Sequence, residues 1–78
     1  MAIYIPIRKV AETQTDVTYV FGDSGAGGKL RFLKTGTEFE ILEIADEERR
    51  DFYLSRVVPV LARHHANGRY PDEACYAA

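Results

Sequence analysis

The sequence predicts an α+β fold, in which a four-stranded antiparallel meander precedes one C-terminal helix that packs on one face of the sheet. Apolar residues alternate with polar ones in four short segments of the first 45 residues, and a helical spacing of apolar residues follows. Only short turns separate successive strands, whereas parallel pairing would need crossovers of about a dozen residues. The chain of 78 residues is short enough to form a single domain, spanning residues 1–78.

The first two strands show the clearest alternation. The first is predicted at residues 3–10, where isoleucine occupies every second position as far as Ile7. Pro6 lies within it and has no amide hydrogen to donate, which predicts that this strand lies at an edge of the sheet. The second strand is predicted at residues 17–21. Its inward face carries three large residues, Val17, Tyr19 and Phe21.

A glycine-rich segment, residues 22–28, ends the second strand and leads into a third strand at residues 29–34. Gly36 then supplies a tight turn, because glycine tolerates positive φ. The fourth strand is predicted at residues 37–45. Its apolar residues change face after Ile41, which predicts a β-bulge at that point.

One helix is predicted to begin after Asp46, a favourable N-cap residue, and to end before Gly68. Its apolar stripe can lie on the sheet and consists of Leu54, Val57, Val58, Leu61 and His65. Pro59 interrupts this pattern and predicts a bend or a split, at a cost of about 3 kcal/mol if nothing compensates. From Arg69 onward the chain is predicted to pack back as an extended segment.

The helix can cover only one face of the sheet. The other face is predicted to carry Tyr4, Arg8, Val10, Thr18, Val20, Arg31 and Leu33. This mixture is more apolar than a solvated face needs. The open face is therefore a candidate interface, either for a partner or for a second copy in a homodimer.

Composition limits the compartment and the chemistry. Cys75 is the only cysteine, which excludes an internal disulfide and a cysteine-based zinc site. The N-terminal residues lack the basic start and the long apolar run of a signal peptide, and no stretch approaches the roughly 18 apolar residues of a membrane span. These features predict a cytoplasmic protein with no membrane association.

None of the usual catalytic patterns is complete. The glycine cluster runs into Lys29, but Leu30 stands where a phosphate-binding loop requires serine or threonine. His64 and His65 are adjacent on the helix, so they diverge by roughly 100° and cannot chelate one ion together. Cys75 has no identifiable group to orient it as a nucleophile. We therefore expect no catalytic residue, no metal ligand and no cofactor, and a protein that is not an enzyme.

Acidic residues gather in one segment of the chain. Between residues 38 and 51 there are seven carboxylates and two arginines. This charge disfavours direct nucleic-acid binding and predicts an anionic surface that meets a basic groove on a protein partner. The residues predicted to bind that partner are Glu38, Glu40, Glu43, Asp46, Glu47 and the aromatic Tyr70.

Several segments together resemble small bacterial proteins. They are residues 3–10 (IYIPIRKV), 19–22 (YVFG) and 28–36 (GKLRFLKTG), followed by Gly68-Arg69-Tyr70-Pro71-Asp72 and an aromatic, Tyr76, near the C-terminus. Those proteins look like the immunity proteins encoded beside secreted toxins, although Pro59 departs from the smoother helix expected of them.

The resemblance implies a stoichiometric inhibitor that neutralises a cytosol-acting toxin. Two alternatives remain open at the level of sequence. The first is a phage-encoded inhibitor of a bacterial defence complex, of the anti-CRISPR type, because its size, acidity and lack of catalytic residues would be the same. The second is a self-associating structural or regulatory module.

Overall fold

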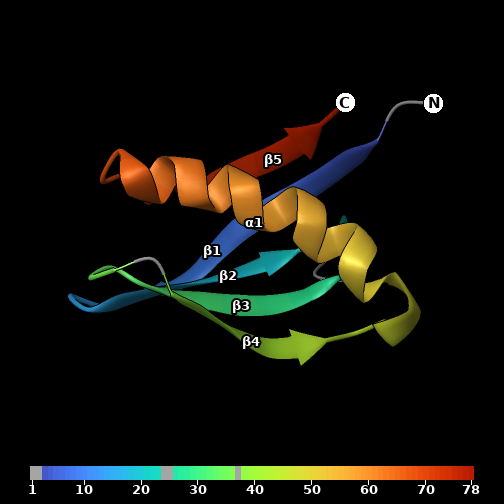
Figure 1. Ribbon diagram of the computed structural model, residues 1–78, viewed down its shortest axis with the longest axis horizontal. Coiled ribbons are helices and arrows are strands. Elements are labelled where there is room, and N and C mark those ends of the chain that lie inside the picture. Colours follow the sequence, from blue (N-terminus) through green and yellow to red (C-terminus); the bar gives the residue numbers. More distant parts are fainter. Residues whose placement is uncertain (1–2, 24–25, 37) are drawn as a thin grey trace.

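The computed structural model describes residues 3–23, 26–36 and 38–78. The elements, in chain order, are β1 (Tyr4–Glu12), β2 (Asp16–Phe21), β3 (Gly28–Leu33), β4 (Phe39–Ile44), a 3₁₀ turn (Glu47–Arg49), α1 (Arg50–Ala66) and β5 (Glu73–Ala77). The strands form one antiparallel sheet in the order β4-β3-β2-β1-β5. Helix α1 lies across one face of this sheet (Figure 1). The α+β class and the single C-terminal helix are as the sequence predicts.

Within the described residues the sheet has five strands, so the prediction of four was wrong. The segment after the helix forms β5, which pairs with β1 on the side away from β2. The ladder extends past both ends of β5. Ile3 and Ala78 exchange two backbone hydrogen bonds of 3.0 Å, and the Lys9 amide donates to the Asp72 carbonyl at 2.8 Å.

The prediction that Pro6 marks an edge strand was also wrong, because β1 has neighbours on both sides. The Gly22 amide donates to the Pro6 carbonyl at 2.9 Å. In an antiparallel ladder the amide and carbonyl of one residue face the same neighbouring strand. The nitrogen of Pro6 therefore faces Gly22, just beyond the end of β2, and β5 loses no hydrogen bond.

The core lies between α1 and the sheet, and the alternation read from the sequence sets it. The buried apolar residues are Ile5, Ile7, Val17, Tyr19, Phe21, Leu30, Phe32, Val57 and Leu61. Seven of them come from β1, β2 and β3, and the other two from α1. Each large side chain buried in this way contributes about 1.5–3 kcal/mol of transfer free energy.

The predicted bulge in β4 is confirmed. Lys29 pairs with Glu43 while the next residue, Leu30, pairs with Ile41, so Leu42 is the extra residue. The bulge returns Ile44 to the core side, where it packs against the buried cluster, and it leaves Leu42 42% exposed. Thr37, where this strand was predicted to begin, lies outside the described residues.

A second bulge lies in β1 and was not predicted. Lys9 pairs with Tyr19, and the next paired residue is Ala11, which leaves Val10 as the extra residue. Without this bulge, Glu12 would share the open face with Val10, because side chains alternate along a strand. With it, Glu12 lies on the same side as Lys9.

The helical segment made of the 3₁₀ turn and α1 is capped at both ends, although Arg49, the residue before α1 itself, makes no side-chain cap. The Glu48 amide donates to Oδ1 of Asp46 at 3.1 Å, so Asp46 caps the 3₁₀ turn that leads into α1. At the other end, the amides of Gly68 and Arg69 donate to the carbonyls of His65 and His64, each at 2.9 Å. Gly68 has a φ of 68°, which completes a Schellman motif.

The predicted split of the helix at Pro59 does not occur, because α1 continues through it from Arg50 to Ala66. Pro59 is exposed, and so is Ser55, the residue whose carbonyl loses its helical hydrogen-bond donor.

The glycine at the start of β3 offers a test of the β3–β4 packing. Gly28 has a φ of 147°, and a Cβ placed on it would collide with the Glu43 carbonyl oxygen. We predict that Gly28→Ala lowers the free energy of unfolding by about 3 kcal/mol, measured by urea denaturation. Gly36→Ala is the matched control, since its φ is 102° but its Cβ would meet open space. If Gly28→Ala lowered the free energy of unfolding no more than Gly36→Ala does, the close packing of Gly28 against Glu43 would be contradicted.

Candidate functional site

The carboxylates predicted to bind a partner follow one edge of the molecule. We call this surface the acidic edge and define it as Glu38, Glu40, Glu43, Asp46, Glu47, Glu48 and Asp51. All seven side chains are exposed. They begin beside β4, which is an edge strand of the sheet, and continue through the 3₁₀ turn into the first turn of α1.

Few of these charges are compensated. Glu40 pairs with Arg31 across the β3–β4 ladder at 2.5 Å, and Glu47 lies 3.8 Å from Arg50. The structure shows no other ion pair on the acidic edge among the residues it describes. The guanidinium of Arg49 turns instead to aromatic rings, lying 5.0 Å from the centroid of Phe52. The acidic edge therefore keeps most of its negative charge.

The structure does not unite all the residues predicted for this site. Glu40 and Glu43 lie on the open face, opposite Arg31 and Lys29 in the ladder. Asp46 and Glu47 lie beyond the C-terminal end of β4, and Glu38 lies before its N-terminal end.

Tyr70 is distant from the part of the acidic edge at the start of α1, although its hydroxyl contacts His65, whose ring also contacts Gly36, two residues before Glu38. Tyr70 follows the C-terminal end of α1, whereas Asp46 and Glu47 precede the N-terminal end, and the helix of 17 residues between them spans about 25 Å. A partner that contacts Asp46, Glu47 and Tyr70 together must therefore cover a surface about 25 Å long.

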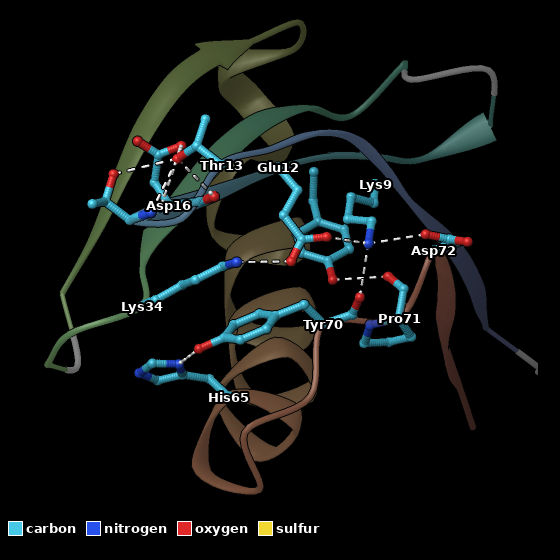
Figure 2. Close-up of polar contacts among 11 residues, drawn as sticks. Lys9, Glu12, Thr13, Asp16, Lys34, His65, Tyr70, Pro71 and Asp72 are labelled. Atoms are coloured by element: carbon cyan, nitrogen blue, oxygen red, sulfur yellow. Dashed lines mark hydrogen bonds and ion pairs between the residues drawn. The ribbon is translucent and has the colours of Figure 1, made fainter.

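Tyr70 belongs to a polar cluster that sequence reasoning missed (Figure 2). Glu12 lies at its centre and accepts hydrogen bonds from two lysines: Lys9 at 2.6 Å and Lys34 at 2.8 Å. Lys9 also pairs with Asp72 at 2.9 Å and donates to the Tyr70 carbonyl at 3.0 Å. The cluster joins β1, the end of β3 and the segment before β5.

These contacts shift two pKa values. The hydrogen bonds from Lys34 and Lys9 lower the pKa of the Glu12 carboxyl to about 2. The hydrogen bonds to Glu12 and Asp72 raise the pKa of Lys9 well above its usual range. Both groups thus remain charged at neutral pH. A carboxylate held ionised between two ammonium groups is a poor proton donor or acceptor at neutral pH.

Two hydroxyl groups extend the same cluster. The Tyr19 hydroxyl donates to the Pro71 carbonyl at 2.8 Å, and burial raises the pKa of this phenol to about 12. His65 donates from Nε2 to the Gly36 carbonyl and accepts at Nδ1 from the Tyr70 hydroxyl at 2.7 Å. Lys34 covers the Tyr70 ring, with its Nζ 5.1 Å from the centroid. Both ring nitrogens of His65 are thus hydrogen-bonded, and His65 holds the turn between β3 and β4 against the C-terminal end of α1.

The open face carries exposed apolar groups, as the alternation predicts. The large apolar side chains exposed there are Tyr4, Val10, Leu33 and Leu42. Part of this face forms a hollow of about 270 Å³, lined by Tyr4, Pro6, Arg8, Val20 and Glu73 among others. Charged residues of both signs lie among these groups, so the open face is amphipathic rather than uniformly apolar.

Among the residues that the structure describes, no group of three His, Cys, Asp or Glu side chains is placed to hold a metal ion. In the same part of the chain, α1 is neither long nor apolar enough to cross a membrane.

The comparisons with known proteins give no assignment. No protein-family model, no curated protein and no solved structure matches this chain.

The position of Glu12 predicts a dependence of stability on pH. Its pKa is lower in the folded chain than the ordinary 4.5, so folding favours the ionised form. The resulting stabilisation is present above pH 4.5 and is lost as the pH falls toward 2. We expect that Glu12→Gln reduces the change in the free energy of unfolding with pH between about pH 2 and 4.5, measured by urea denaturation. Glu48→Gln, which removes an exposed glutamate outside the cluster, should leave the slope unchanged, and equal slopes for all three proteins would contradict the assignment.

Proposed function

We propose that this domain is a non-catalytic binding protein, a stoichiometric inhibitor of the immunity type that neutralises a cytosol-acting toxin in the cytoplasm. The observation that carries the proposal is the acidic edge, with seven exposed carboxylates along an edge strand and the adjoining helix start. A surface of this charge suits a basic groove, such as the one a nucleic-acid-handling toxin uses for phosphates.

The arrangement of the acidic edge supports binding to a folded protein partner. Glu43 and Glu48 lie on rigid elements or directly beside them, so binding needs little ordering of the backbone. Complementary charge accelerates encounter with the partner and disfavours wrong partners. The resemblance of the sequence to immunity proteins points in the same direction.

An inhibitor of a bacterial defence complex, of the anti-CRISPR type, would use the same surface chemistry. The identity of the captured partner separates the two: a toxin domain for the first, a subunit of a defence complex for the second. A self-associating module would instead use an apolar surface. The observation that favours such a module is Tyr4, which lies on the open face and is 64% exposed.

The experiment combines partner capture with a charge test. We predict that the tagged protein retains one basic protein from its native lysate in near-equal amount, and that it inhibits the activity of this protein at one-to-one stoichiometry without turnover. Glu43→Gln combined with Glu48→Gln should weaken the affinity about tenfold, because two rim charges are lost, and calorimetric titration measures this change.

The control variant changes the net charge by the same amount but at a surface away from the acidic edge. Ala62→Lys combined with Ala66→Lys alters two exposed positions of α1 and also raises the net charge by two. It should leave the affinity near the wild-type value. Equal affinities for the glutamine variant and the wild type would contradict the role of the acidic edge, and sub-stoichiometric inhibition would contradict a stoichiometric inhibitor.

A further inference from the structure

The two edge strands of the sheet, β4 and β5, differ in how well they are protected against pairing with a strand of another chain. β4 carries a bulge at Leu42 and two carboxylates, Glu40 and Glu43, and these features discourage a further strand from adding to it. β5 has no proline, no lysine and no shift in its register with β1. Its sequence is short and mostly small: Glu73, Ala74, Cys75, Tyr76 and Ala77.

The hydrogen bonds of β5 show which of its backbone groups are free. Ala78 exchanges two hydrogen bonds with Ile3, and the register continues without a shift along β5. Bonding alternates along an antiparallel strand, so the even-numbered residues of β5 face β1. The amides and carbonyls of Glu73, Cys75 and Ala77 therefore point away from the sheet. Among the described residues, no strand lies beyond them.

We propose that β5 pairs antiparallel with β5 of a second copy of this chain, about a two-fold axis at Cys75. This register keeps the outward-facing residues opposite one another and uses all five residues of the strand. It supplies about six backbone hydrogen bonds, two for each hydrogen-bonded pair. The product is one continuous sheet of ten strands, five from each copy.

The occupant is a second copy because β5 is complementary to itself in this register. Glu73 faces Ala77 of the second copy, so no carboxylate meets another, and Arg8 lies beside Glu73 in the same sheet. On the helix side, Tyr76 faces Ala74 of the second copy, which pairs a large side chain with a small one. A register centred on Glu73 would place two glutamates directly opposite and is therefore disfavoured.

The proposal does not depend on the proposed function. β5 and the acidic edge lie at opposite ends of the strand order, so each copy in the dimer keeps its acidic edge free. A failure of the dimer would leave the inhibitor proposal standing, and the reverse also holds. If both are correct, the assembly presents two acidic edges at its two far ends.

Cross-linking tests the register directly. Cys75 is free and exposed, and a hydrogen-bonded antiparallel pair places its two Cα atoms about 5.5 Å apart, within the range for a disulfide. Mild oxidation of the wild-type protein with diamide should give a covalent dimer on non-reducing gels. Cys75→Ser should lose the cross-link but remain a dimer by sedimentation equilibrium. A wild-type protein that is monomeric at every concentration tested would overturn the proposal.

Two substitutions at Ala77 form a matched pair. Ala77 is exposed and lies on the open side with Cys75, so either change leaves the core intact. Ala77→Glu places a carboxylate opposite Glu73 twice in each dimer and should weaken dimerisation about tenfold, whereas Ala77→Lys should strengthen it. Equal dimer affinities for the two variants would overturn β5 pairing. A dimer that is insensitive to both but lost in Leu33→Lys would place the contact on the open face and would also overturn it.

Discussion

The pairing of β1 with its two neighbours is the constraint on which the rest of the structure depends. β1 is hydrogen-bonded to β2 on one side and to β5 on the other, so it joins the two ends of the chain. Its bulge at Val10 directs Glu12 toward Lys9 and Lys34. That ion cluster ties β1 to the end of β3 and to the segment that enters β5, and α1 can then close over the sheet. Loss of the bulge would turn Glu12 to the open face and remove its pairing with both lysines.

Much of the fold can be predicted from sequence because it depends on local periodicity. The inward residues of β2 and β3, the bulge at Leu42 and the caps of α1 all follow from spacing and from residue type. The fifth strand could not be predicted, since β5 is five residues long and has only one strongly apolar aromatic, Tyr76. Pro6 led to the wrong prediction of an edge strand, because the sequence does not show which neighbouring strand its nitrogen faces.

The candidate site, like the fold, could be predicted only in part. The acidic edge was visible because its carboxylates are close in sequence, and the structure keeps them on one edge. Tyr70 was grouped with them although it belongs to the polar cluster at the far end of α1. Apart from Lys9 and Glu12, the partners within that cluster are distant in sequence, and only the bulge at Val10 brings Glu12 into it. The chain thus separates an anionic edge at β4, which resists further pairing, from a bare edge at β5.

Hydrogen exchange of the native protein, followed residue by residue by NMR, tests the central role of the β1–β5 pairing most directly. The amides of Ile3 and Lys9 donate to the carbonyls of Ala78 and Asp72, the two residues that flank β5, at the two ends of the ladder. If β5 is an integral strand, the amides of Ile5 and Ile7 between them should exchange as slowly as those of Tyr19 and Leu30 in the core. Fast exchange at Ile5 and Ile7, with Tyr19 and Leu30 still protected, would show that β5 is a loosely held tail and would contradict this account.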